Sequence, residues 1–176
     1  MTNNDILRSI RYTFNFDDSK MIAIFGQADH PVSRQQISDW LKKDDDPAYQ
    51  ECSDNLLAIF LNGLIIEKRG KKEMPHPEPE KRLSNNIIKR AKPVKPQPEP
   101  ETRLTNNIVF MKLKIALNLK ADDVLAIMDQ AEFGMSKHEL SAFFRKPGHK
   151  HYRECKDQIL RNFLKGLQRK YRPAPD

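Results

Sequence analysis

Basic side chains gather in the last third of the chain, where they could bind the phosphate backbone of a nucleic acid. Some precede the last predicted helix and others follow along it to Arg172, with Tyr152 and Tyr171 between them. Such clusters bind phosphates through charge and counterion release, and aromatic rings can stack on bases. A solvated charged face, or a docking surface for the acidic first part of the chain, are the alternatives. The predicted contacts are Lys146, Lys150, His151, Arg153, Arg161, Lys165, Arg169 and Lys170.

No catalytic or metal-binding arrangement stands out elsewhere. His138, His149, His151 and Cys155 match no tight ligand spacing, so we expect no metal site and no cofactor. The six glycines form no phosphate-cradling loop, so an enzyme is not predicted. A helix-turn-helix over residues 18–43 or 121–146 is an alternative DNA-reading element, although its turn lacks the usual glycine.

Two cysteines, Cys52 and Cys155, each stand at the start of a predicted helix. The helix dipole can lower a thiol pKa at that position, which would favour a reactive thiol. Packing in the core is the favoured interpretation. Two cysteines at matching places do not indicate a disulfide framework, so the sequence predicts a reducing cytoplasm.

All these residues belong to an internal duplication. Residues 2–64 align with residues 105–167 at a constant offset of 103 without a gap, and 20 of the 63 positions are identical. We therefore predict a first helical repeat over residues 1–70, a charged Pro-rich linker over 71–103 and a second repeat over 104–172. The linker is expected to be an extended, partly polyproline tether with one short helix over residues 84–90.

The sequence of each repeat predicts four helices. We therefore expect an all-α fold of two pseudo-symmetric four-helix lobes. Apolar residues recur at helical spacing, and side chains suited to N-capping precede them. Gly63 and Gly166 lie inside the fourth helices, where glycine costs about 1 kcal/mol relative to alanine, so close helix approach is expected there. The helices should begin near Thr2, Asp18, Ser33 and residue 53, and near Thr105, residue 121, Ser136 and residue 156.

The fourth helix of the first repeat is apolar on almost every side, unlike its counterpart. Ala58, Asn62 and Ile66 stand where the second repeat has Arg161, Lys165 and Arg169. A helix of this kind is buried all round, so we expect its outer face to pack on the second lobe or on another copy. The alternative function is therefore a protein-interaction adaptor or a homodimer, assembled through Ile59, Ile65 and Ile66.

Charge is unevenly distributed along the chain. The net charge is +7, but residues 1–70 carry 8 basic and 11 acidic side chains, whereas residues 104–176 carry 14 and 8. This asymmetry favours a polyanion-binding face or two lobes that attract each other. No apolar run reaches the roughly 18 to 20 residues that span a bilayer, and residues 1–5 do not begin a signal peptide. We therefore expect a cytoplasmic protein with no membrane partner.

Five segments together resemble the bacterial YehS family. They are NDILRSIRY at 4–12, DWLKKD at 39–44, FLNGLII at 60–66, SKHELSAFFR at 136–145 and HKHYREC at 149–155. The resemblance covers both repeats and implies a small bacterial cytoplasmic protein with a tandem helical domain. Because the family's function is unknown, it implies no activity and no binding residues. The longer, internally duplicated Pro-rich linker departs from the family pattern.

Overall fold

The computed structural model describes residues 1–70 and 99–172, and these residues form eight helices and no strand. The predicted all-α class is confirmed. The predicted helix over 84–90 and most of the predicted linker lie outside the described residues. In chain order the helices are α1 (Asn3–Phe14), α2 (Asp18–Gln27), α3 (Arg34–Leu41), α4 (Asp54–Arg69), α5 (Asn106–Ala116), α6 (Ala121–Gln130), α7 (Lys137–Phe143) and α8 (Asp157–Tyr171).

Local signals in the sequence position the helix ends. The Thr2 and Thr105 side chains cap α1 and α5, and the Ser33 and Ser136 side chains form capping boxes with Gln36 and Glu139 at the starts of α3 and α7. Asn15 ends α1 in the left-handed conformation, with φ of 53°. No helix in the described residues is long and apolar enough to cross a membrane.

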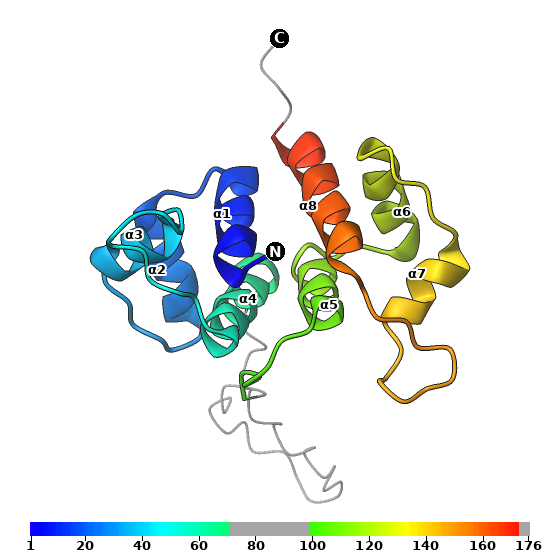
Figure 1. Cartoon of the computed structure of the whole chain (residues 1–176), viewed down its shortest axis with the longest axis horizontal. Helices are drawn as coiled ribbons and strands as arrows, with labels where there is room; N and C mark the ends of the chain where they lie inside the picture. Colours follow the sequence, from blue (N-terminus) through cyan, green and yellow to red (C-terminus); the bar gives the residue numbers. More distant parts are fainter. Residues whose placement is uncertain (71–98, 173–176) are drawn as a thin grey trace, which may run out of the picture.

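Two pairs of helices join the lobes. α1 packs on α8 and α4 packs on α5, and Figure 1 shows these four helices in the middle, with α2 and α3 on one side and α6 and α7 on the other. Because α5 and α8 are the counterparts of α1 and α4, the α1–α8 contact is the counterpart of the α4–α5 contact. The same surface is therefore used by both lobes, as in a twofold dimer. The two predicted pseudo-symmetric lobes are confirmed.

Hydrogen bonds across this interface repeat with the offset of 103. The Arg172 guanidinium donates to the Tyr12 carbonyl at 2.8 Å, and Arg69 donates to the Ile115 carbonyl at 3.4 Å. At the other end, the Met1 amine donates to Asp157 at 2.8 Å, and the Leu104 amide donates to Asp54 at 3.0 Å. Both ends of the interface therefore carry paired polar contacts.

The outer face of α4 is expected to pack either on the second lobe or on another copy of the chain. In the structure the second lobe covers it, through α5. Ile59 is 7% exposed, whereas Ile65 and Ile66 are half-buried. In the same contact Lys112 of α5 donates to the Asn62 amide oxygen at 2.5 Å and lies 3.1 Å from the Glu101 carboxylate.

Gly63 and Gly166 permit the predicted close helix approach. A Cβ added to Gly63 would lie 2.9 Å from the carbonyl carbon of Ile24 and closer still to its oxygen. At Gly166 the same holds for Ile127, also with 2.9 Å to the carbonyl carbon. The two glycines thus let α4 reach α2, and α8 reach α6, at nearly backbone contact.

Asn4 lies in the first turn of α1 but does not cap the helix, which is capped by Thr2. The buried Asn4 amide instead donates to the carbonyls of Trp40 and Gln50, both at 2.8 Å, and its oxygen accepts from the Cys52 amide at 2.9 Å. Buried backbone groups need such partners, and here Asn4 of α1 supplies them to α3 and to the segment before α4.

Candidate nucleic-acid interface

The predicted basic residues fall into two groups in the structure. Lys146, Lys150, His151 and Arg153 lie on the connection from α7 to α8, which bends at Gly148 with φ of 90°, and all four are exposed. Arg153 is anchored through its amide to the Ala142 carbonyl at 3.1 Å. This connection is the lower right-hand loop in Figure 1.

The second group runs along α8, from Arg161 to Lys170, and its members point in different directions. Arg161 and Lys165 line a groove of about 300 Å³ beside α1. Arg169 instead turns toward the other side, where it donates to the Gln130 carbonyl and lies 3.5 Å from Glu132. The structure therefore places the Arg161–Lys165 pair and Arg169 on different sides of α8.

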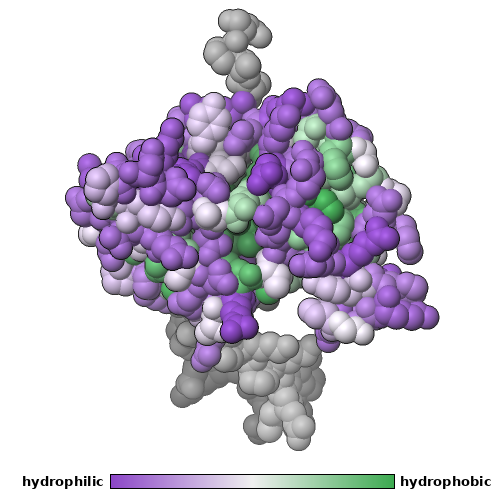
Figure 2. Space-filling view, in the orientation of Figure 1, coloured by the Kyte–Doolittle hydropathy of each residue, from purple (hydrophilic) through white to green (hydrophobic). Residues whose placement is uncertain are grey.

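Most of the eight cations form no ion pair with another described residue, although Asp5 lines the same groove as Arg161 and Lys165. Within the described residues, Arg169 is the one member of the eight with an ion-pair partner within 4 Å. The counterpart of the loop in the first repeat carries Asp44, Asp45 and Asp46. Figure 2 shows a largely hydrophilic surface on the face in view, with apolar side chains confined to small areas.

A further hollow was not anticipated from the sequence. A groove of about 660 Å³ lies between α1, α3 and the end of α8, and Arg8, Arg11, Tyr12, Lys42 and Arg172 are among the residues that line it. The sequence singled out Arg172 as the end of a basic row but not the first-lobe residues. The available signal was the group Arg8, Arg11 and Tyr12, which falls on one polar side of the first helix at helical spacing.

The cysteines and histidines do not form a reactive or metal-binding centre in the described part of the chain. Cys52 and Cys155 are each 1% exposed, and burial raises the pKa of each thiol to about 12. A thiol with so high a pKa is not a thiolate nucleophile at neutral pH. Among the residues that the structure describes, no group of three or more His, Cys, Asp or Glu side chains could hold a metal ion.

In the helix-turn-helix alternative, the recognition helix would be α3 or α7, and both carry few basic residues. α3 presents Arg34 as its one cation, and Lys137 of α7 lies 3.5 Å from Asp122. The turn after α2 needs no glycine, because Asp29 itself adopts the left-handed conformation with φ of 56°.

Comparisons with known proteins give a family and no activity. A family model described as "Protein of unknown function (DUF1456)" matches residues 3–70 and 106–172. The chain is 42% identical over 168 residues to the "Uncharacterized protein YehS" of Escherichia coli (strain K12). The aligned residues cover 95% of this chain and 94% of that protein. No solved structure matches the chain.

Proposed function

The chain belongs to the DUF1456 family of unknown function, as the resemblance to YehS indicated, and we propose that it binds the phosphate backbone of nucleic acid. The contacts are the exposed cations of the second repeat. The supporting observation is that all eight side chains are exposed and that, within the described residues, seven of them have no carboxylate within 4 Å. The contacts are Lys146, Lys150, His151, Arg153, Arg161, Lys165, Arg169 and Lys170.

Phosphate binding suits this surface better than recognition of base sequence. Cations that are not already paired can replace the counterions condensed on a polyanion, which makes affinity depend steeply on salt. In the helix-turn-helix alternative of the first repeat, α3 would be the recognition helix, and Arg34 is its one cation. We therefore expect binding with little sequence preference.

The test is a salt titration of labelled single-stranded and double-stranded DNA and RNA, followed by fluorescence anisotropy. The triple variant Arg161→Glu, Lys165→Glu, Arg169→Glu should bind about 100-fold more weakly at 0.1 M salt, since three phosphate contacts with a slope of about −0.7 each contribute about two decades. A matched variant changes the exposed Arg34, Lys43 and Lys120 to Glu, which lowers the net charge by the same amount.

The control separates a local surface from total charge. Equal loss of affinity in both triple variants would mean that net charge alone governs binding. No binding by the unaltered protein at about 50 mM salt would refute the proposal.

The alternative, an adaptor or homodimer assembled through Ile59, Ile65 and Ile66, has less support. α4 already packs on α2 and α5, and Ile59 is 7% exposed. A partner that used Ile59 would have to displace α5, so the alternative requires the two lobes to separate.

A further inference from the structure

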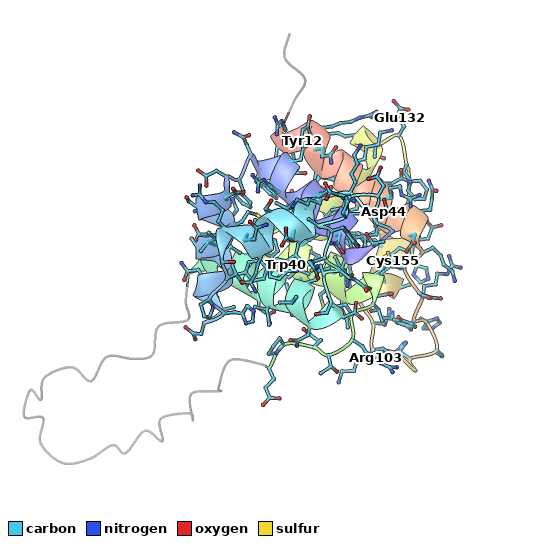
Figure 3. All side chains as sticks on the ribbon, turned by 60° about the vertical axis from the view of Figure 1, so that its left-hand side comes forward. Tyr12, Trp40, Asp44, Arg103, Glu132 and Cys155 are labelled. Carbon is cyan, nitrogen blue, oxygen red and sulfur yellow. The ribbon has the colours of Figure 1, made fainter. Side chains whose placement is uncertain are left out.

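The groove of about 660 Å³ between α1, α3 and the end of α8, which we call the first-lobe groove, combines an exposed aromatic ring with cations from both lobes. Tyr12, near the end of α1, is 53% exposed, the largest value among the exposed large hydrophobic side chains of the described residues. The Arg172 guanidinium lies over its ring, 3.9 Å from the centroid, and Figure 3 shows Tyr12 beside the end of α8. Because Arg172 also donates to the Tyr12 carbonyl at 2.8 Å, the pair is fixed at two points.

The charges of this groove are mostly compensated. Arg8 pairs with Asp5 and donates to the Lys42 carbonyl at 2.7 Å, and Arg11 lies 2.5 Å from Asp18. Lys42 lies 3.1 Å from Asp39. Among the described residues, Arg172 is the one of these four cations without a carboxylate within 4 Å, so the excess charge of the groove is small. Electrostatic attraction alone would therefore hold an anion weakly here.

For a nucleotide, an aromatic ring adds a stacking contact to this weak electrostatic attraction. Stacking of a base on an aromatic side chain contributes strongly to single-strand binding and tolerates any sequence, since every base has a π-face. A guanidinium plane offers a second stacking surface and a phosphate donor. The Tyr12–Arg172 pair supplies both, and the fixed guanidiniums of Arg8 and Arg11 border the same hollow.

The groove continues the proposed basic surface. α1 and α8 run side by side in the same direction, since Met1 contacts Asp157, Ser9 bonds Gln168 at 3.1 Å and Tyr12 contacts Arg172. The smaller groove with Arg161 and Lys165 lies along the same pair of helices, and Ser9 and Gln168 also line it. Along α8, Arg161 and Arg172 are separated by about 16 Å, so a strand bound at one could reach the other.

We propose that a nucleotide of a single-stranded nucleic acid occupies the first-lobe groove, with its base against Tyr12 and Arg172 and its phosphate toward Arg8 and Arg11. This inference rests on the proposed nucleic-acid function and deepens it. It makes the protein prefer single strands, because the bases of a duplex are paired and stacked and cannot reach the ring.

The test compares Tyr12→Ala, Tyr12→Phe and Ile115→Ala by fluorescence anisotropy with a labelled oligo-dT strand and a duplex of the same length. Ile115 is the counterpart of Tyr12 in the second repeat and is 37% exposed, so its truncation is the matched control. Tyr12→Ala should weaken single-strand binding about tenfold, Tyr12→Phe should retain it, and duplex binding should change less than twofold. Ile115→Ala should change neither.

The outcomes separate this inference from the proposed function. If the triple Glu variant of α8 loses binding but Tyr12→Ala binds oligo-dT normally, the base site is refuted and backbone binding stands. Equal losses for strand and duplex in Tyr12→Ala also refute it. If the unaltered protein binds neither strand nor duplex, both proposals fall. Matching melting temperatures of Tyr12→Ala and Ile115→Ala exclude unfolding as the cause of a difference.

Discussion

Replacement of Gly166 by alanine tests the packing that joins α6 to α8. The added Cβ would lie 2.9 Å from the Ile127 carbonyl carbon and closer to its oxygen, so the two backbones must separate. A gap of 0.5 to 1 Å forfeits a quarter to a half of each dispersion contact across the interface. For about 40 atom pairs at about 0.15 kcal/mol each, the loss is roughly 1.5 to 3 kcal/mol.

Alanine also returns part of this loss, because it is the better helix former by about 1 kcal/mol. The net expectation for Gly166→Ala is destabilisation by roughly 0.5 to 2 kcal/mol. Gly63→Ala should behave alike, because its Cβ would meet Ile24 in the same way. Gly26 lies inside α2, and a Cβ there would meet nothing within 4 Å. Gly26→Ala should therefore stabilise the protein by about 0.5 to 1 kcal/mol.

Urea unfolding monitored by circular dichroism at 222 nm measures all three variants against the unaltered chain. Gly166→Ala and Gly26→Ala should change the free energy of unfolding in opposite directions. Both substitutions improve helix propensity, but only the Cβ added at position 166 would meet the backbone of another helix. Stability of Gly166→Ala at or above that of the unaltered protein would refute the close-approach explanation for Gly63 and Gly166.

Two further predictions concern polar groups. Asn4→Ala should lower the free energy of unfolding in urea by about 2 to 4 kcal/mol, because it leaves the Trp40 carbonyl and the Cys52 amide without their hydrogen-bond partner. The control Gln35→Ala, on the exposed side of α3, should change it by no more than about 0.5 kcal/mol. Similar values for both variants would contradict the role of Asn4 in linking α1 to these backbone groups. The hydrogen bond from Lys20 holds the pKa of the Glu67 carboxyl below its usual range. A lowered folded-state pKa contributes stability above the unfolded value, near 4.3, that is lost as pH falls through the folded pKa. The stability advantage over Glu67→Gln should therefore shrink below about pH 4, and an advantage unchanged at pH 3 would argue against this ion pair.

Much of the fold could be predicted because its signals are local. A capping side chain such as Thr2 or Ser136 acts within three residues, and apolar spacing identifies a helix within a few turns. The gapless repeat added a second, independent copy of each signal. The mid-helix glycines could be interpreted in the same way, since glycine in a helix has a cost that close packing explains.

The candidate site could be predicted only in part. The sequence showed that cations cluster in the second repeat, but it did not show that Arg161 and Lys165 face α1 while Arg169 turns toward Glu132. Those directions depend on which helices flank α8. The first-lobe groove was missed for the same reason, since Tyr12 and Arg172 are 160 residues apart.

The sequence by itself determined the all-α class, the helix ends, the duplication and the need of α4 for a partner. Only the tertiary structure decided that this partner is α5 of the same chain, and that α1 and α8 form the matching contact. The physical reason is that capping and helical periodicity are short-range, whereas the choice of partner depends on which apolar faces bury each other most completely. That choice also placed Arg172 over Tyr12, and with it the site that we propose for a nucleotide.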